Sequence, residues 1–215
     1  MEVSMRVSAG QARGRELKVP SGRIRPTSQL VREAVFNVWR PLVPESRFLE
    51  LFAGSGSMGI EALSRGARSC LFVEKNPAAC RIIRENLHSL QFADRAEVWN
   101  LDVTVAVKKI AARGWQFDLI YLDPPYDYPR LEALVAGIPP ALLTEVGMMA
   151  IETRAGMSLR FASGLVRYRQ KRYGDTAVTF LRKVEGDAQC IEVAGRTGGE
   201  NKPGPAAAHD QQSSP

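Results

Sequence analysis

The residues best suited to chemistry in this 215-residue chain form the run Asp123-Pro124-Pro125-Tyr126, directly after the apolar stretch 117–122. Proline has no N–H, so this turn presents a carboxylate and carbonyl oxygens rather than donors. Such acceptors can bind both hydrogens of a planar amino group and localise its lone pair, while Tyr126 stacks on the attached base. The run therefore predicts a site for an exocyclic base amine, although a simple turn with Asp as a helix cap would read the same way.

A second motif lies upstream, where a short apolar strand leads into a glycine turn. Gly54, Gly56 and Gly59 allow the backbone to turn tightly and to approach a ligand closely. The next expected strand ends at Glu74, twenty residues beyond Gly54, where a carboxylate can accept hydrogen bonds from both hydroxyls of a ribose. We therefore expect a cofactor that contains a nucleoside, at the carboxyl ends of adjacent parallel strands.

The glycine spacing also satisfies the dinucleotide fingerprint G-x-G-x-x-G, so a nicotinamide or flavin oxidoreductase is the main alternative. Acidic residues favour a cofactor with a positive end instead. Glu50 stands inside the first strand, where it can meet an ammonium group, and Asp102 follows the third strand, where it can bind an adenine amine. The Asp-Pro-Pro-Tyr turn has no role in hydride transfer. S-adenosyl-L-methionine, with its ammonium and sulfonium, is the cofactor that these residues favour.

The stretch from Glu50 to Gly56, Glu74 and the Asp-Pro-Pro-Tyr turn resemble the motifs of class I S-adenosylmethionine-dependent methyltransferases that act on base amines. More narrowly, the chain resembles the bacterial family that methylates the exocyclic N2 of a guanine in small-subunit (16S) ribosomal RNA. This resemblance covers about Met5 to Lys183. The stretches that carry the narrower resemblance are 10–17, 25–27, 31–37, 61–67 and 172–176.

The resemblance implies a role for each motif. Glu50 would orient the cofactor ammonium, directly or through water, Glu74 would hold the ribose, and Asp102 would bind the adenine. Asp123 and the Pro124 carbonyl would accept hydrogen bonds from the guanine N2 amine. The expected cofactor-binding residues are Glu50, Phe52, Gly54, Gly56, Gly59, Glu74, Lys75 and Asp102, and the expected catalytic residues are Asp123, Pro124, Pro125 and Tyr126.

The hydrophobic pattern predicts alternating strands and helices, typical of a doubly wound α/β fold with a mostly parallel sheet. With the resemblance, we expect a Rossmann-like sheet of seven strands whose last strand is antiparallel, preceded by a small N-terminal β-hairpin. The expected strands are 48–52, 69–74, 96–100, 117–122, 147–153, 159–169 and 176–183, and the hairpin strands are 5–9 and 16–19. The expected helices are 58–65, 76–90, 104–113 and 130–137, besides one that Pro26-Thr27 opens with Leu30, Ala34 and Val38 on one face.

We expect three parts along the chain: an RNA-contacting hairpin arm at 1–25, a methyltransferase domain at 26–185 and a disordered tail at 186–215. The formal net charge is +6, and the tail carries four acids and two bases, so residues 1–185 carry about +8. Basic clusters near both ends of this part predict a rim that grips RNA phosphates, although basic side chains can also simply solvate a surface. The candidate RNA-binding residues are Arg13, Arg15, Arg25, Arg32, Arg172 and Tyr173.

Composition limits the class of protein. Apolar residues make up 45% of the chain, no apolar run reaches the ~18–20 residues of a membrane span, and no leader is expected. Cys70, Cys80 and Cys190 lack the spacing of metal ligands, and His88 and His209 have no partners that suggest a metal or a catalytic base. We therefore expect a cytoplasmic monomer without a metal, whose partner is small-subunit ribosomal RNA, within an assembling 30S subunit as the resemblance implies.

Two alternatives remain open from sequence. The Asp-Pro-Pro-Tyr turn does not name the base, so a DNA methyltransferase acting on adenine N6 or cytosine N4 is one of them. Only about forty residues precede the cofactor strand, however, and DNA-reading enzymes usually need a larger recognition domain. The other alternative is a non-catalytic RNA-binding assembly factor that retains a vestigial cofactor pocket.

Overall fold

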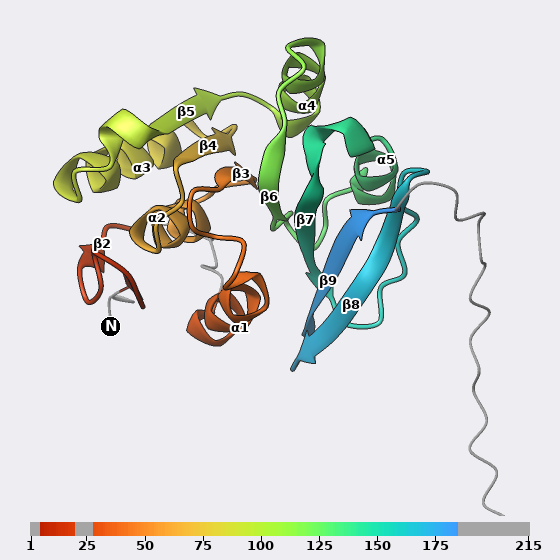
Figure 1. Cartoon of the computed structure of the whole chain (residues 1–215), viewed down its shortest axis with the longest axis horizontal. Coiled ribbons are helices and arrows are strands. Elements are labelled where there is room, and N and C mark those ends of the chain that lie inside the picture. Colours follow the sequence, from red (N-terminus) through yellow and green to blue (C-terminus); the bar gives the residue numbers. More distant parts are fainter. Residues whose placement is uncertain (1–4, 20–27, 185–215) are drawn as a thin grey trace, which may run out of the picture. The chain divides into compact units, whose positions relative to one another are not determined.

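The computed structural model describes residues 5–19 and 28–184, which contain a two-stranded sheet and a seven-stranded sheet with helices on both faces (Figure 1). The strands are β1 (Met5–Arg6), β2 (Glu16–Leu17), β3 (Arg47–Leu51), β4 (Ser69–Glu74), β5 (Ala96–Asn100), β6 (Phe117–Leu122), β7 (Leu143–Arg154), β8 (Leu165–Tyr173) and β9 (Thr176–Lys183). The helices are α1 (Gln29–Trp39), α2 (Ser57–Ser64), α3 (Pro77–Ser89), α4 (Val103–Ala112) and α5 (Leu131–Ala136), with 3-10 turns η1 (Ala93–Arg95) and η2 (Pro140–Leu142).

The large sheet has the strand order β5-β4-β3-β6-β7-β9-β8. The first five strands in this order run parallel, and β9 runs antiparallel to both of its neighbours. The chain moves outward from β3 to β5 and then returns to the other side of β3 as β6. This reversal of strand order creates a crevice at the carboxyl ends of β3 and β6, where doubly wound sheets bind ligands. The predicted seven-stranded fold, including its antiparallel last strand and N-terminal hairpin, is confirmed.

Alternation along each strand divides the core between the two faces of the sheet. Phe48 of β3 packs with α1, α2 and α3, whereas its neighbour Leu49 packs with α4 and α5. On the first face Trp39 is fully buried and contacts the rings of Phe48, Tyr121 and Phe180 edge-on. Because β3 residues two apart share a face, Glu50 also points to the side of α1–α3. The sheet therefore delivers this acid to one defined surface.

The apolar face predicted for α1 is not the face that is most deeply buried. Leu30 is 63% exposed, and the buried residues of this helix are Val31, Arg32, Val35, Phe36 and Trp39. The helix begins at Gln29, where Ser28 caps it by accepting a hydrogen bond from the Val31 amide at 3.3 Å. Pro26 and Thr27, the predicted start signal, lie outside the described residues.

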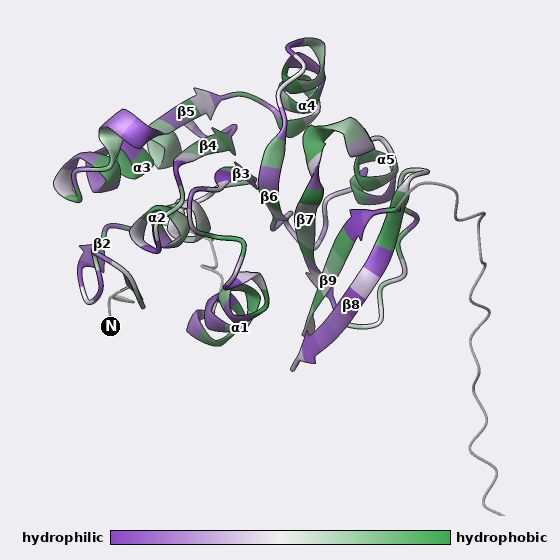
Figure 2. Ribbon diagram, in the orientation of Figure 1, coloured by the Kyte–Doolittle hydropathy of each residue, from purple (hydrophilic) through white to green (hydrophobic). Residues whose placement is uncertain are grey.

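The boundaries of two late strands also differ from prediction. β7 extends four residues further upstream than expected, and β8 begins at Leu165 rather than at residue 159. Gly164 has a φ of +92°, and Leu165 donates a backbone hydrogen bond to Ala162, so a turn holds this stretch out of the sheet. With these bounds β8 contains most of the basic residues of this stretch, and it forms the edge of the sheet. Figure 2 shows β8 as largely hydrophilic.

The N-terminal hairpin packs against the end of α2. The backbone amide of Gln11 donates a hydrogen bond to the Ser64 carbonyl at 2.8 Å. The Glu61 carboxylate accepts hydrogen bonds from the backbone amides of Ser8 and Ala9. Gly10 has a φ of +81°, and a Cβ there would lie 1.8 Å from the Ser64 carbonyl oxygen. Glycine is therefore required by both the turn and the close approach of the two backbones.

Candidate active site

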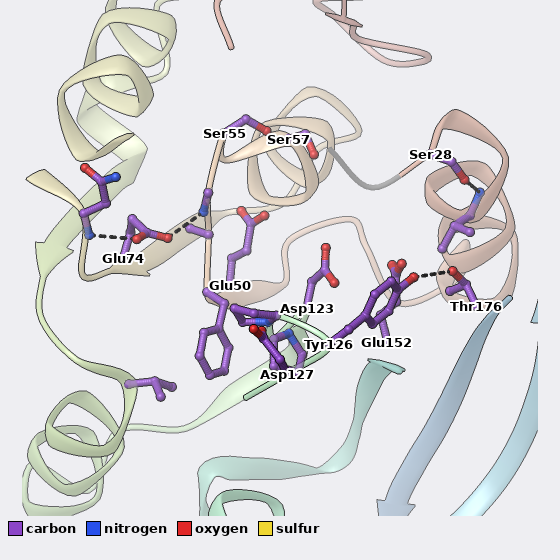
Figure 3. Close-up of a pocket in the computed structure, with 18 of the residues that line it drawn as sticks. Ser28, Glu50, Ser55, Ser57, Glu74, Asp123, Tyr126, Asp127, Glu152 and Thr176 are labelled. Carbon is purple, nitrogen blue, oxygen red and sulfur yellow. Dashed lines mark hydrogen bonds between the residues drawn. The ribbon is translucent and has the colours of Figure 1, made fainter. Parts of the chain in front are cut away.

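A cavity of about 820 Å³ opens at the carboxyl ends of β3, β4, β6 and β7 (Figure 3). The predicted cofactor motif, apart from Gly56 and Gly59, and the predicted acceptor motif both line it, although they are about seventy residues apart in the chain. The lining residues are Ser28, Val31, Glu50, Phe52, Ala53, Gly54, Ser55, Ser57, Glu74, Lys75, Asn76, Asp102, Val103, Asp123, Pro124, Pro125, Tyr126, Asp127, Glu152, Tyr173, Gly174, Asp175 and Thr176.

The glycine turn between β3 and α2 adopts left-handed backbone conformations. Phe52, Gly54 and Gly56 have φ values of +60°, +54° and +74°, and Gly56 is the N-cap of α2. Positive φ is uncommon for a residue such as Phe52, and backbone strain of this kind is concentrated at functional sites. Gly59 serves packing instead, because a Cβ there would lie 2.4 Å from the Phe72 ring of β4. Gly56 and Gly59 thus let the first turn of α2 lie close to the sheet.

Glu50 is 3% exposed, and its carboxyl accepts hydrogen bonds from the amides of Gly59 at 2.8 Å and Met58 at 3.3 Å. Burial raises the pKa of this carboxyl from 4.5 to about 8, while the two amides act in the opposite direction. The neighbouring Asp123 and Glu74 also raise the pKa. At neutral pH the group is therefore mostly protonated, and an adjacent cation would favour its ionised form.

Glu74 links the glycine turn to the start of α3. One carboxylate oxygen accepts a hydrogen bond from the Gly54 amide at 2.9 Å, and the other accepts one from the Asn76 amide at 2.8 Å. Asn76 in turn caps α3, because its side chain accepts hydrogen bonds from the backbone amides of Ala78 and Ala79. Each Glu74 oxygen has a second lone pair, so the carboxylate is held in place and still has acceptor capacity for hydroxyl donors.

Asp102 lies at the rim of the cavity and is the N-cap of α4. It accepts hydrogen bonds from the amide of Thr104 at 2.8 Å and from the hydroxyl of the same residue at 2.5 Å. The Thr104 side chain lowers the pKa of this carboxyl, despite some desolvation. Asp102 is therefore an ionised capping residue beside the cavity, and its contact with an adenine stays a prediction. The neighbouring predicted residue Lys75 is exposed and also lines the cavity.

The Asp-Pro-Pro-Tyr turn closes β6 and does not begin a helix. The next helix, α5, starts at Leu131, so the predicted alternative of Asp123 as a helix cap is not observed. Tyr126 is fixed by a hydrogen bond of 2.8 Å between its hydroxyl and that of Thr176, and the Arg154 guanidinium lies 5.7 Å from its ring centre. The aromatic ring is therefore held in one position at the cavity wall.

The charge of the cavity lining is strongly asymmetric, with seven carboxyl groups and one lysine. The carboxyl groups belong to Glu50, Glu74, Asp102, Asp123, Asp127, Glu152 and Asp175, and the lysine is Lys75. This lining favours a cation and amine donors, and it disfavours phosphate groups. An RNA substrate must therefore place its phosphates outside the cavity.

The predicted RNA-binding residues fall into different environments. Arg13, Arg15 and Arg172 are exposed, and Tyr173 lines the cavity. Arg25 lies outside the described residues. The predicted role of Arg32 needs correction.

The Arg32 side chain is buried, with 2% of the residue exposed. It donates a hydrogen bond to the Arg6 carbonyl at 2.8 Å, and its Nε lies 3.6 Å from the Glu61 carboxylate. Its observed role is to hold α1, α2 and the hairpin together. Arg32 is therefore a structural residue, and its side chain is not part of an exposed basic surface.

Sequence reasoning missed Glu152, which lies near the end of β7, lines the cavity and is 6% exposed. The Tyr121 hydroxyl donates a hydrogen bond of 2.7 Å to one of its oxygens. An acid near the end of an apolar strand was the signal that identified Glu74, and the same signal was present here.

Comparison with known proteins agrees with this geometry. Residues 5–182 match the family described as conserved hypothetical protein 95. The chain is 39% identical over 182 residues to the putative rRNA methyltransferase YlbH of Bacillus subtilis, across 83% of this chain and 99% of that protein. The chain belongs to this family. Another relative, ribosomal RNA small subunit methyltransferase D of Escherichia coli, is 35% identical over 162 residues, across 75% of this chain and 77% of the relative.

Solved structures give the same result for the fold of this family. A hypothetical protein of Thermus thermophilus, TTHA0928, has a TM-score of 0.73 and 33% identity, covering 84% of this chain and 99% of that chain. The putative methyltransferase yhhF of Escherichia coli has a TM-score of 0.70 and 30% identity, covering 84% and 98%. The family predicted from the motifs is thus confirmed, together with its class I methyltransferase fold.

Proposed function

We propose that this chain transfers a methyl group from S-adenosyl-L-methionine to the exocyclic N2 amine of a guanine in small-subunit ribosomal RNA. The observation that carries the proposal is the meeting of two motifs in one cavity. The turn at Gly54, joined to Glu74, forms one end, and the Asp-Pro-Pro-Tyr turn forms the other. Membership of a family that includes rRNA methyltransferases supports the same reaction.

The residues of the cavity fit the proposed cofactor. The buried Glu50 carboxyl becomes a favourable partner for an ammonium group once it ionises, and Glu74 offers acceptors for ribose hydroxyls. Asp102 offers an ionised acceptor for an adenine amine. S-adenosyl-L-methionine, when bound, supplies an electrophilic methyl group and a positive charge that suits this acidic lining.

The chain's own contribution to the reaction is to position the acceptor amine. The Asp123 carboxylate and the Pro124 carbonyl accept the two amine hydrogens, which directs the nitrogen lone pair out of conjugation with the ring. Tyr126 stacks on the base and fixes its plane. Positioning of this kind supplies much of the barrier reduction in a displacement reaction. Asp123 or a water molecule takes the proton that the amine releases.

The substrate must present an unpaired base, because a stacked base cannot enter a cavity at the edge of a sheet. Its phosphates would lie on exposed cations of the hairpin and of β8, which include Arg13, Arg15 and Arg172. We propose an assembling 30S subunit as the setting, with the protein acting as a cytoplasmic monomer. In the described part of the chain, no helix has the length and apolar character of a membrane span.

A single substitution tests the proposal. Asp123→Ala should abolish methyl transfer to small-subunit particles and leave cofactor affinity, measured by calorimetry, largely unchanged. Asp94→Ala is a matched control, because Asp94 is exposed in η1 and does not line the cavity. Mass spectrometry of the digested RNA would identify the methylated nucleoside. Near-normal turnover by the Asp123 variant, or a product other than N2-methylguanosine, would contradict the proposal.

A further inference from the structure

The cavity holds a second carboxylate next to Asp123 that has no role in the reaction described above. Leu122 of β6 pairs with Ile151 of β7 in parallel register, so Asp123 and Glu152 follow side by side on neighbouring strands. Both strands alternate their side chains, and Leu122 and Ile151 belong to the core on the α4–α5 side. The two acids therefore point to the opposite face and into the cavity, where Figure 3 shows them beside Tyr126.

Glu152 is held in a fixed orientation while it faces the cavity. Its Oε2 accepts the hydrogen bond from the Tyr121 hydroxyl at 2.7 Å, and Tyr121 is 1% exposed and packs edge-on against Trp39. A carboxylate has about four acceptor positions, so the hydrogen bond from Tyr121 is compatible with a further donor from a ligand in the cavity. A nearly buried carboxylate that a core tyrosine holds in one orientation is well suited to accept a hydrogen bond from a specific donor of a ligand.

The bases that carry an exocyclic amine differ at the ring nitrogen beside it. In guanine, N1 carries a hydrogen next to the N2 amine and is a donor. In adenine and cytosine, the ring nitrogen next to the amine is an acceptor. Two neighbouring carboxylates, one for the amine and one for the adjacent ring nitrogen, therefore match guanine and oppose the other two bases.

We propose that Glu152 accepts a hydrogen bond from N1–H of the target guanine and thereby determines which base is methylated. The inference rests on the proposed function and adds a specificity residue to it. An adenine or cytosine placed on Asp123 would bring the lone pair of its ring nitrogen against the Glu152 carboxylate. A substrate that leaves a buried polar group of the site without a hydrogen-bond partner is strongly disfavoured, and so is one that meets a repulsive contact.

The test compares guanine with 2-aminopurine, which keeps the N2 amine and has an unprotonated N1. Each base is placed at the nucleotide that the wild-type protein methylates, in otherwise identical reconstituted small-subunit particles. Glu152→Gln should lower kcat/KM on guanine at least 10-fold. It should also reduce the preference for guanine over 2-aminopurine at least 10-fold, since the amide can donate to the unprotonated N1. Cofactor affinity should change less than twofold.

Tyr121→Phe is the matched control, because it removes the hydrogen bond to Glu152 and keeps the carboxylate. The base preference of this variant should stay within a factor of three of wild type. Glu152→Asp, with the same charge, should keep the preference for guanine at a reduced rate, and it serves as the test if the Gln variant does not fold.

The outcomes separate the two proposals. A wild-type protein that methylates no guanine overturns the proposed function, and the specificity inference with it. A wild-type protein that methylates guanine, with an unchanged base preference in Glu152→Gln, overturns the inference alone. The inference is also overturned if Tyr121→Phe changes the preference as much as Glu152→Gln does, or if Glu152→Asp loses it.

Discussion

Replacing Glu50 with Gln should change how the stability of the protein depends on pH. The folded protein holds the Glu50 proton with a pKa of about 8, whereas the unfolded chain releases it near 4.5. Between these values the folded state binds more protons, so each rise in pH lowers the free energy of unfolding. The stabilisation from this group is complete below pH 4.5 and is lost as the pH rises through 8.

The size of the effect follows from the same shift. One pKa unit corresponds to about 1.4 kcal/mol, so the wild-type protein should lose stability relative to the Gln variant by up to that amount per pH unit. From pH 4.5 to 8 the difference accumulates to roughly 5 kcal/mol as an upper bound, since relaxation of the site reduces it. The Gln side chain can still accept the hydrogen bond from the Gly59 amide at 2.8 Å, so the comparison mainly isolates the titration.

Urea unfolding of both proteins at half-unit steps from pH 5 to 8 measures this difference directly. Parallel stability curves across that range would show that Glu50 is ionised in the folded chain, and the reasoning would be refuted. A second readout uses the cofactor. Since burial keeps Glu50 mostly protonated at pH 7, binding of an ammonium beside it should release a proton. Calorimetry in two buffers of different ionisation enthalpy detects that proton, and Glu50→Gln should remove it.

Three further predictions concern packing and RNA binding. Gly59→Ala should lower the free energy of unfolding by about 1–3 kcal/mol in urea titrations, because its Cβ would lie 2.4 Å from a buried ring of β4. Gly10→Ala should expose the hairpin to proteolysis, because its Cβ would lie 1.8 Å from a carbonyl oxygen of α2. Replacing Arg167, Arg169 and Lys171 of β8 together with Gln should weaken RNA binding and reduce its salt slope by about 0.7 per lost phosphate contact, or about 2 in total.

Matched variants control for side effects of these changes. Gly114 also has a positive φ, of +63°, but a Cβ there meets no atom within 4 Å, so Gly114→Ala carries the backbone strain without the clash. Equal proteolysis of the Gly10 and Gly114 variants would contradict the docking argument. Arg68, Arg81 and Lys108 are exposed and lie outside β8, so their joint replacement with Gln repeats the change in charge. An equal loss of RNA affinity in both triple variants would remove β8 from the RNA surface.

The sheet and most of the acidic site could be predicted because both depend on local signals. An apolar run identifies a parallel strand, and in such a fold the residues after the strand meet at one edge of the sheet. The sequence alone therefore predicts that Glu74 and Asp123 lie at the same edge. The limits of β8 could not be predicted in the same way. Leu159 and Phe161 continue the apolar pattern, yet they pack beside the sheet while Gly164 turns the chain into it.

Arg32 shows a second feature that could not be predicted from the sequence, namely whether a basic residue is buried or exposed. A buried arginine and an exposed one look alike in a basic segment, and only the fold places Arg32 beside Glu61. Glu61 also contacts Arg65 at 2.8 Å and the Ser8 hydroxyl at 2.6 Å. Removal of one partner from such a buried group strongly destabilises a protein. Basic residues near the N-terminus therefore divide between a structural set and an exposed set, and their spacing in sequence does not show which is which.

The distribution of charge is compatible with the proposal that one protein binds both a cationic cofactor and a polyanion. Seven carboxyl groups and Lys75 line the cavity, whereas β8 carries Arg167, Arg169, Lys171 and Arg172 on the strand that forms the edge of the sheet. The β8–β9 turn, with Gly174 in the cavity wall, joins the two regions. In the proposed complex, phosphates on β8 would be repelled by the carboxylates, so only an unstacked base would enter the cavity. In the proposed reaction, the acids that bind the cofactor would thereby also select a single extended nucleotide, and the contacts with Asp123 and Glu152 would then decide which base reacts.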